Sequence, residues 1–422
     1  MEEIIGKIFI YLGVVIGILF VLCYFHTNIY MIITLLFNPE TKKAKKNHRY
    51  GFIICARNEE AVIGNLISSI KAQDYPQELI NIYVMADNCI DNTATCARMA
   101  GATKVFERFN KEKVGKGYAL EALFDELLKD EEAMKCEGFF VFDADNTLNK
   151  NYTARMNDVF DNGARIATGY RCASNFKDGF IATANGYYFM RDCFVMHRAR
   201  TIIGASTMVT GTGWLMSSDI IKKENGWHYV CLAEDSEFIT EQVLKGEKSV
   251  YCHDAIFYDE QPITFSQSWK QRKRWLKGTV QVTNRYFKEL LKGIFKSENR
   301  FTCYDFFVSA VSYVYLTAIG GIVGIASCIF NMLTASSVLQ AILIALGYLG
   351  GLYSAFIFMA LVPVLGCWKR VPLSAGKKIL YLLMFPAFVA TYIPLAVIAL
   401  FSKDVKWEPI AHGVKNNKTA SM

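Results

Sequence analysis

Four stretches of this chain are apolar for long enough to cross a lipid bilayer, and they limit its possible folds more than any other feature. They cover residues 4–37, 306–333, 338–367 and 379–401. Each reaches the roughly 20 residues that an α-helix needs to span the hydrocarbon core. A mean hydropathy of +0.20 over 422 residues fits such helices combined with one polar domain. We therefore expect a multi-pass protein of the cell membrane, with the lipid bilayer as a partner.

The charges beside these stretches predict which side of the membrane each flank faces. The first stretch, assigned to a transmembrane helix at residues 1–40, is far longer than the apolar part of a signal peptide and lacks a small-residue cleavage site. We expect it to be retained as an anchor. A basic run follows it directly, formed by Lys42, Lys43, Lys45, Lys46, His48 and Arg49. Because cytoplasmic flanks are enriched in lysine and arginine, the polar region after this run is expected in the cytoplasm.

The C-terminal stretches leave one question of topology open. About three transmembrane helices are expected within residues 306–401, followed by a tail at residues 402–422. An odd number of crossings would place the lysines of that tail outside, against the charge rule. The alternative is that one of these stretches is re-entrant or lies in the membrane interface.

Composition argues against a nucleic-acid partner and against a disulfide or zinc framework. The net charge of +7 is small for this length and lies largely beside apolar stretches, which suits membrane flanks better than a nucleic-acid surface. The twelve cysteines form no CxxC pair and no Cys/His cluster at zinc-binding spacing. They are expected to be buried thiols in a reducing compartment. The sequence makes no prediction about the oligomeric state.

The long polar region alternates short apolar runs with helix-like stretches. Residues 62–70 repeat apolar side chains at helical spacing. This alternation predicts an α/β domain with a parallel, Rossmann-like sheet, in which ligands gather at the carboxyl ends of the strands. We assign the domain to residues 48–265, and residues 266–305 to amphipathic helices at the membrane interface. The runs expected to be strands are 50–55, 80–85 and 138–142.

Two aspartates directly follow the third apolar run. Residues two apart in an extended chain face the same way, so the carboxylates of Asp143 and Asp145 can face one divalent ion and the phosphates that it holds. Carboxylate oxygens suit Mg²⁺ or Mn²⁺. The alternative is a solvated turn, because Asp-x-Asp is a short and common pattern.

A second acidic pair, Glu234 and Asp235, follows a glycine-rich stretch at residues 210–214. A carboxylate close to a bound donor can take the proton from an attacking acceptor hydroxyl. We choose Asp235 as this base. The alternative is a helix N-terminus, where acidic residues favour the helix dipole without taking part in chemistry.

The run Gln271-Arg272-Lys273-Arg274-Trp275 is the most specific pattern. In a helix, Gln271, Arg274 and Trp275 share one face and offer an amide, a guanidinium for a phosphate and an indole plate for a sugar ring. Arg272 then points elsewhere. The structural alternative is a basic amphipathic helix on the cytoplasmic membrane surface, and the two interpretations are compatible.

Asp-x-Asp, Glu-Asp and Gln-x-x-Arg-Trp, in this order and followed by apolar helices, resemble glycosyltransferase family 2 over roughly residues 50–280. The pattern is most similar to the processive synthases of cellulose, mixed-linkage β-glucan, hyaluronan, chitin and poly-N-acetylglucosamine. The resemblance implies a GT-A fold, a UDP-sugar donor and inversion at the anomeric carbon without a covalent enzyme intermediate.

The same resemblance implies roles for five residues of the donor site. Glu59 and Asp87 match acidic residues that hold the nucleoside. Lys116, between two glycines, matches the lysine of a nucleotide-binding loop. Asp143 would face the nucleotide, and Asp145 would ligate the Mg²⁺ or Mn²⁺ ion.

On the acceptor side, Asp235 matches the catalytic base of the family. Arg274 and Trp275 match the pair that steadies the diphosphate and the acceptor, and Gln271 belongs to the same motif. Trp214, after the glycine-rich stretch, is expected to meet the acceptor sugar.

These observations predict a membrane-bound inverting glycosyltransferase that extends a β-linked polysaccharide acceptor from a UDP-sugar, with UDP-glucose favoured, and couples synthesis to translocation. One alternative is a non-processive enzyme of the same fold that glycosylates a lipid. Another is a transporter or a catalytically silent scaffold, although the apolar stretches contain no acidic residues of the kind that ion-coupled transporters use.

Overall fold

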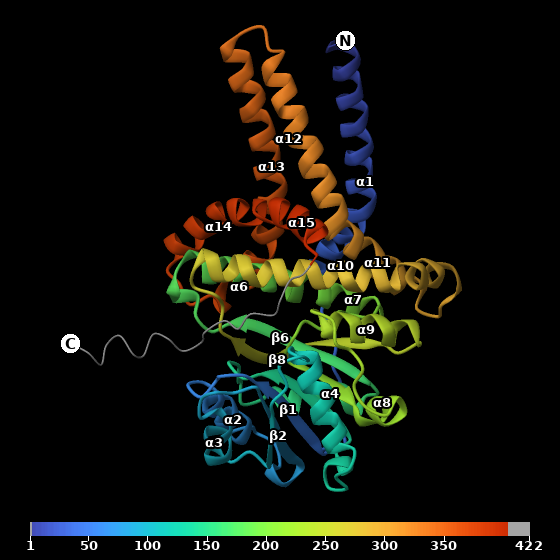
Figure 1. Ribbon diagram of the computed structural model, residues 1–422, viewed down its shortest axis with the longest axis vertical. Helices are drawn as coiled ribbons and strands as arrows, with labels where there is room; N and C mark the ends of the chain where they lie inside the picture. The colour runs from blue at the N-terminus through green and yellow to red at the C-terminus, as the bar shows by residue number, and fades with distance from the viewer. Residues whose placement is uncertain (1, 404–422) are drawn as a thin grey trace, which may run out of the picture.

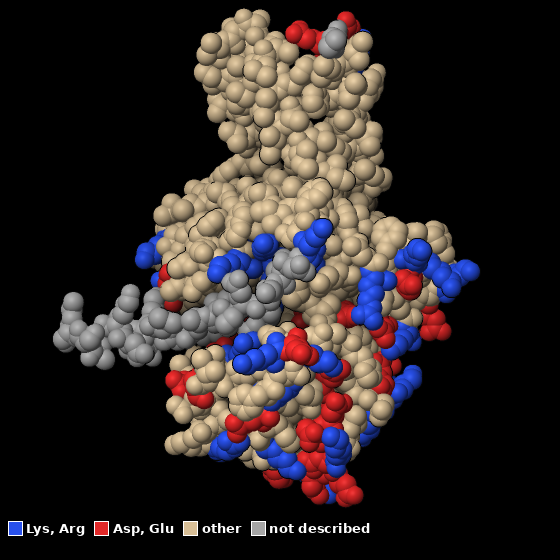
Figure 2. Space-filling model, in the orientation of Figure 1, with Lys and Arg blue, Asp and Glu red and all other residues tan. Residues whose placement is uncertain are grey.

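The computed structural model describes residues 2–403, which are arranged on three levels (Figure 1). A sheet with helices on both faces lies at one end, a layer of helices lies across it, and three long helices project from that layer. In Figure 2, charged side chains cover the sheet domain and the level of the helix layer, whereas the projecting helices carry them only near the N-terminal end. The polar and apolar parts of the sequence are thus separated in space.

The sheet has eight strands in the order β3-β2-β1-β4-β7-β6-β8-β5. β1 lies between β2 and β4 and runs parallel to both, as the alternation of strands and helices predicts. The prediction of a parallel sheet is incomplete, because β7 runs antiparallel to β4 and β6 after a turn with Gly211 and Gly213 at positive φ. The strands are Tyr50–Ala56 (β1), Ile80–Asp87 (β2), Lys104–Arg108 (β3), Gly138–Asp143 (β4), Thr147–Leu148 (β5), Ile166–Ala173 (β6), Trp214–Ser217 (β7) and Ser249–Asp259 (β8).

Helices cover both faces of the sheet, which explains why its central strands are apolar at consecutive positions. Phe52 and Ile54 of β1 pack with residues of α2, α3 and α5, whereas Ile53 packs with residues of α4, α8 and α9. Parallel strands buried on both faces appear in a sequence as continuous apolar runs. These helices are Ile63–Lys71 (α2), Thr93–Ala100 (α3), Lys116–Leu127 (α4), Tyr152–Asp161 (α5), Ser218–Glu224 (α8) and Glu234–Leu244 (α9).

The layer across the sheet is formed mainly by α6 and α10 (Figure 1). α10 begins at a capping box formed by Thr264 and Gln267. It is amphipathic, since Leu276 is buried while Lys288 and Lys292 are exposed. The segments at this level are Phe180–Arg191 (α6), the π-helical Asp192–His197 (η4), Arg198–Ile202 (α7), Phe265–Lys296 (α10) and Arg300–Val311 (α11).

The three projecting helices are α1 (Glu2–Leu36), α12 (Thr317–Leu333) and α13 (Val338–Gly366), and α12 contacts both of the others. A π-helical segment, Ser312–Leu316 (η5), joins α11 to α12 without a break. All three are parts of helices long and apolar enough to cross a membrane. In the most apolar part of α1 and of α13, no residue is buried within the described protein.

The last apolar stretch has a different arrangement. It consists of α14 (Ala375–Ala390) and α15 (Tyr392–Phe401), which meet at Thr391. By length and composition it could also cross a membrane, but half of its most apolar part is buried. Figure 1 shows both helices lying across the projecting bundle, next to α6 and α10. This stretch therefore packs on the helix layer instead of projecting from it.

A buried ionic cluster fixes the first helix to the rest of the protein. Asp305 of α11 accepts two hydrogen bonds from Arg200 of α7, at 2.6 and 2.9 Å. It also accepts one from the hydroxyl of Tyr30, at 2.8 Å, and lies 3.1 Å from Nε2 of His26. All four side chains are buried. The cluster thus joins α1, α7 and α11 at the base of the projecting helices.

Candidate active site

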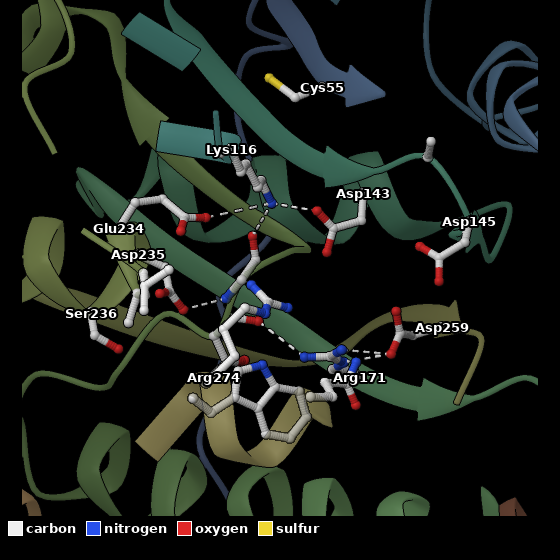
Figure 3. A pocket seen from close by; sticks show the side chains of 18 of the residues that line it. Cys55, Lys116, Asp143, Asp145, Arg171, Glu234, Asp235, Ser236, Asp259 and Arg274 are labelled. Carbon is white, nitrogen blue, oxygen red and sulfur yellow. Dashed lines mark hydrogen bonds and ion pairs between the residues drawn. The ribbon is translucent and has the colours of Figure 1, made fainter. Parts of the chain in front are cut away.

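A cleft of about 290 Å³ lies between the carboxyl ends of β1, β2 and β4 and the helix layer (Figure 3). Its lining comes from segments that are far apart in the sequence, as expected for a site at strand ends. All predicted site residues except Trp214 line it. They are Glu59, Asp87, Lys116, Asp143, Asp145, Asp235, Gln271, Arg274 and Trp275.

Lys116 lies at the centre of the cleft wall, at the start of α4. Its ammonium group contacts Asp143, donates to the carbonyl oxygen of Gly211 at 2.6 Å and lies 4.0 Å from Glu234 (Figure 3). Burial alone would lower the pKa of Lys116, but the facing carboxylates raise it above its usual value. The residue after it must be a glycine, because a Cβ at Gly117 would collide with the backbone at Tyr229. The fold thus fixes a permanent positive charge in the cleft.

Asp143 and Asp145 follow β4 and both line the cleft, as predicted. The carboxylate of Asp143 forms an ion pair with Lys116, and the backbone N–H of Asp143 donates to the hydroxyl of Thr212 at 2.9 Å. Asp145 accepts a hydrogen bond from the side-chain amide of Asn146 at 3.2 Å. Burial raises the pKa of Asp143, but Lys116 outweighs this and holds the pKa below its usual value.

The donor atoms at these positions fit a divalent cation that is shared with a ligand. Among the described residues, no group of three or more His, Cys, Asp or Glu side chains is placed to hold a metal ion alone. Mg²⁺ at nucleotide sites takes one or two carboxylates and completes its shell with phosphate oxygens and water. Asp145 and Asp143 supply such carboxylates, so the residues present fit a metal bound together with a diphosphate.

Glu234 and Asp235 lie in the first turn of α9, as the helix alternative predicts, and both also face the cleft. The Asp235 carboxylate accepts the backbone N–H of Gly211 at 2.5 Å (Figure 3). Burial raises the pKa of Asp235. Burial and the neighbouring Asp235 raise the pKa of Glu234 to about 7. The acidic turn therefore begins a helix and also presents two perturbed carboxyl groups to the cleft.

The helical interpretation of the Gln-x-x-Arg-Trp run holds. Gln271, Arg274 and Trp275 line the cleft from α10. Arg272 points away from it and is completely buried, with its guanidinium over the ring of Phe388 and a hydrogen bond of 2.6 Å to Thr391. One arginine of this run therefore faces the cleft, and the other packs against the C-terminal helices.

Trp214 does not reach the cleft, so the expected acceptor contact is wrong. Its side chain is 1% exposed and stacks on Phe238 at 5.1 Å, next to Trp227. The positive φ of Gly213 turns the chain into β7, where the indole faces the core under α9. The physical reason is that Trp214 begins a buried strand instead of belonging to the glycine-rich loop.

Glu59 and Asp87 lie at the far end of the cleft from α10. Glu59 precedes α2, and its backbone N–H donates to the hydroxyl of Thr93 at 2.8 Å. Asp87 ends β2 and forms an ion pair with Arg108 at 2.5 Å. Both carboxyl groups line the cleft on the side of the first two strands.

Sequence reasoning did not find a buried ion pair in the cleft wall. Arg171 of β6 donates to Asp259 of β8 through two nitrogens, at 2.9 and 2.6 Å (Figure 3). Asp259 also accepts the side-chain amide of Asn146 at 2.8 Å. Asp259 ends a strand. The signal that could have identified it is the apolar run at residues 255–258, which ends in Asp259 as the run at residues 138–142 ends in Asp143.

Residues 48–278 match the family described as "Glycosyltransferase like family 2". This match covers just over half of the chain and includes every residue at the cleft that the sequence had singled out.

Three curated relatives show more distant similarity. The chain is 23% identical to the probable glycosyltransferase YdaM of Bacillus subtilis, over 86% of each chain. It is 24% identical to a beta-monoglucosyldiacylglycerol synthase of Nostoc, over 57% of this chain and 51% of that protein. It is 22% identical to a poly-beta-1,6-N-acetyl-D-glucosamine synthase of Staphylococcus epidermidis, over 57% of both. The chain thus spans about half the length of the two relatives whose names state a product.

One solved structure shares the fold over nearly the whole chain. It is the mannosyltransferase PcManGT of Pyrobaculum calidifontis in complex with GDP-Man and Mn²⁺. The TM-score is 0.63 at 16% identity, over 93% of this chain and all of that one. The fold is therefore a mixed α/β glycosyltransferase fold of the GT-A type.

Proposed function

The chain belongs to the glycosyltransferase-like family 2, and from this premise we propose that it transfers a sugar from a UDP-sugar to an acceptor hydroxyl at the cytoplasmic face of the cell membrane. The observation that carries the proposal is the convergence of Lys116, Asp143, Asp145, Asp235 and Arg274 in one cleft. Two basic groups for a diphosphate, carboxylates for a metal and a half-buried base are the parts that such a transfer needs.

The donor would lie along the strand ends. Glu59 and Asp87 would contact the nucleoside, at the end of the cleft formed by β1 and β2. Lys116 and Arg274 would bind the diphosphate, because an ammonium and a guanidinium both stabilise phosphate oxygens. Before the donor binds, Asp143 and the Gly211 carbonyl hold Lys116 in the cleft.

Asp145, together with Asp143, would hold Mg²⁺ or Mn²⁺ against the diphosphate. The bound ion would neutralise the negative charge that develops on the departing UDP. The mannosyltransferase with the same fold was solved with Mn²⁺ and GDP-Man, which supports a divalent ion at a nucleotide-sugar site of this fold.

Asp235 would act as the general base. The acceptor oxygen attacks the anomeric carbon while its proton passes to the Asp235 carboxylate, and the bond from the anomeric carbon to the UDP oxygen breaks. This displacement inverts the anomeric centre. A raised pKa suits a base that must accept a proton near neutral pH, and the Gly211 N–H orients the carboxylate.

The arrangement of the long helices favours an acceptor that stays in the membrane. Translocation of a hydrated glycan needs an enclosed polar path, because unsatisfied polar groups are costly in hydrocarbon. Of the projecting helices, α12 contacts both α1 and α13, whereas α1 and α13 are not in comparable contact with each other. The described helices therefore do not surround a channel, and we propose a lipid-anchored acceptor, with UDP-glucose as the donor to test first.

The second candidate is extension of a β-linked polysaccharide. The Gln-x-x-Arg-Trp face on α10 supports it, as does the similarity to the poly-beta-1,6-N-acetyl-D-glucosamine synthase. A polymer would then need a path contributed by further copies or by other proteins.

Product analysis separates these two candidates. Membranes that contain the protein are incubated with radiolabelled UDP-glucose or UDP-N-acetylglucosamine and Mn²⁺, and the label is extracted into organic solvent. The lipid proposal predicts a labelled lipid-linked monosaccharide in the solvent phase. Label confined to high-molecular-weight, solvent-insoluble material would contradict it and support the polymer.

The same geometry supports a topology. α1, α12 and α13 would cross the membrane, whereas α14 and α15 would lie in its cytoplasmic interface. Two crossings after the sheet domain return the chain to the cytoplasmic side. The tail predicted at residues 402–422 lies, after residue 403, outside the described residues, and its lysines would then satisfy the charge rule.

A further inference from the structure

The cleft does not end at Trp275. Its lining continues toward the projecting helices through Tyr188 at the end of α6, Asp192 at the start of η4 and Tyr313 in η5. We call these three residues the membrane-side subsite. None of them belongs to a sequence motif, and none has a part in the donor site or in proton transfer.

Two of the three residues lie in π-helical segments. Asp192 begins η4 and Tyr313 is the second residue of η5. A π-helical turn widens the helix at the cost of regular hydrogen bonding, and such turns occur frequently at functional sites. Two of them contribute to the lining of the same cleft, on the side where a membrane-bound acceptor would enter.

The aromatic rings of the subsite are held in place by packing. Tyr188 stacks on Tyr392 with ring centroids 5.5 Å apart, and Tyr313 lies 5.7 Å from the same ring. Phe189 meets the edge of Trp275 at 5.6 Å. These rings form a wall against which the apolar face of a sugar or a short alkyl segment can pack without ordering new side chains.

The polar groups of the subsite suit hydroxyl groups. One oxygen of the Asp192 carboxylate accepts a hydrogen bond of 2.9 Å from Arg191. Its second oxygen can accept a hydrogen bond from a ligand hydroxyl, whereas a phosphate or carboxylate has no proton to donate there and would place a second anion beside the carboxylate. The side-chain oxygen of Gln271, also in the cleft lining, is buried without a hydrogen-bond partner in the structure of residues 2–403. A ligand hydroxyl would satisfy it.

We propose that Tyr188, Asp192 and Tyr313 bind the acceptor and select an uncharged polyhydroxyl group, either a sugar or a glycerol headgroup, over a phosphorylated or otherwise anionic one. This inference rests on the proposed transferase function. It adds the class of acceptor and the residues that select it.

The test uses the full chain in phosphatidylcholine nanodiscs and measures UDP release from UDP-glucose. The acceptor probes are octyl β-D-glucoside, 1-O-octylglycerol and octyl β-D-glucuronide, which share one tail and differ in the headgroup. We expect the wild type to prefer at least one neutral probe over the glucuronide. Comparison of the glucoside with the octylglycerol identifies which neutral headgroup is bound.

Asp192→Asn removes the charge and keeps the shape. It should raise the KM for the preferred neutral probe about tenfold, the equivalent of one charge-assisted hydrogen bond, and reduce the discrimination against the glucuronide. The KM for UDP-glucose and the slow hydrolysis of UDP-glucose without acceptor should not change. Asp219→Asn, at an exposed position on α8, is the matched control.

Tyr313→Phe is the second variant, because it keeps the ring and leaves the ion pair of Asp192 intact. It should raise the acceptor KM about two- to tenfold with the donor KM unchanged, whereas Tyr11→Phe on the exposed surface of α1 should change neither.

Other outcomes would contradict either the proposed transferase function or the proposed membrane-side subsite. A wild type that releases UDP from no UDP-sugar overturns the proposed function itself. A wild type that hydrolyses UDP-glucose but is stimulated by neither neutral probe overturns the subsite alone. Unchanged acceptor KM values in both variants, or an equal rise in donor and acceptor KM, also overturn the subsite.

Discussion

At the scale of single residues, the cleft gives chemically similar carboxyl groups different properties. Asp143 faces Lys116, so its pKa lies below the usual value. Asp235 faces no cation as closely, and burial raises its pKa. Glu234 is held at a pKa of about 7 by burial and by Asp235. Environment thus separates Asp143, whose pKa is lowered, from Asp235 and Glu234, whose pKa values are raised.

The raised pKa of Glu234 predicts a pH dependence of stability. An acid whose pKa rises from 4.5 to about 7 on folding stabilises the folded state below pH 4.5, and this contribution is lost as the pH rises through 7. Glu234→Gln mimics the protonated form. The variant should therefore have a higher free energy of unfolding than the wild type at pH 8, by an amount on the order of 1–3 kcal/mol, and a higher unfolding temperature. The difference should shrink at pH 5.

Thermal unfolding of both proteins between pH 5 and pH 8 measures this effect. Glu131→Gln, at an exposed position, is the control and should show no pH-dependent difference. A Glu234→Gln variant with the same difference from wild type at both pH values would contradict the perturbed pKa.

The proposed role of Asp145 in binding the metal leads to a prediction about Mn²⁺ dependence. Asp145→Asn should raise the concentration of Mn²⁺ needed for half-maximal UDP release by at least about tenfold, because a neutral amide binds a hard cation more weakly than a carboxylate. Chelation with EDTA should abolish wild-type activity, and added Mn²⁺ should restore it. Unaltered Mn²⁺ dependence in Asp145→Asn would remove this residue from the metal site.

Residue by residue, the sequence predicts the motif positions better than their partners. Asp143, Asp235 and Arg274 lie in the cleft because strand ends and one helix face determine where they point. The pair of Arg171 and Asp259 could not be predicted, since the two strands become neighbours only in the folded sheet. The prediction that Trp214 meets the acceptor was wrong for the same reason, because its indole is held by core contacts that no local pattern shows.

At the scale of elements, α10 joins the cleft to the C-terminal helices α14 and α15 through its two faces. Arg274 lines the cleft, while Arg272, two residues earlier, is buried against Phe388 and Thr391. Helical geometry predicts this separation from the sequence alone. The tilt of α14 and α15 could not be predicted, because their composition suits a spanning helix as well as an interfacial one.

The two arginines form a matched pair for mutation. Arg274→Ala should lower kcat/KM for the UDP-sugar by about 100- to 1,000-fold with little change in thermal stability, because it removes a group that stabilises the leaving diphosphate. Arg272→Ala should instead lower the free energy of unfolding by about 1–3 kcal/mol and leave the donor KM unchanged. The reverse pattern would contradict the assignment of the two faces.

At the scale of the whole molecule, the cluster around Asp305 connects the catalytic domain to the first projecting helix. Asp305→Asn would leave Arg200 buried without its counter-charge, and Tyr30 and His26 would lose an ionised partner. Breaking a buried ion pair in this way typically costs about 3–5 kcal/mol. The variant should show a lower unfolding temperature in nanodiscs and faster proteolysis in the linker at residues 37–49.

Asp219→Asn serves as the control for this variant as well. Its side chain is exposed on α8, which packs on β4 and β7 of the sheet. Equal protease sensitivity and equal unfolding temperatures for Asp305→Asn and wild type would show that the cluster does not hold α1 to the domain.

The separation of apolar bundle, amphipathic layer and sheet follows from the sequence, since hydropathy and charge determine which segments can lie together. The path of the acceptor does not follow from it. It depends on how the cleft continues past Trp275 to Tyr313 and on how the projecting helices lie beside one another. Both are properties of the assembled molecule.

We propose that the cleft transfers sugar with Asp235 as the base. The most direct measurement is UDP release by the purified full chain from UDP-glucose or UDP-N-acetylglucosamine, with Mn²⁺ and acceptor lipids, for the wild type and for Asp235→Asn. We expect acceptor-dependent UDP release by the wild type and a loss of at least about 100-fold in kcat for Asp235→Asn, with the KM for the donor nearly unchanged. Full activity of Asp235→Asn would contradict it.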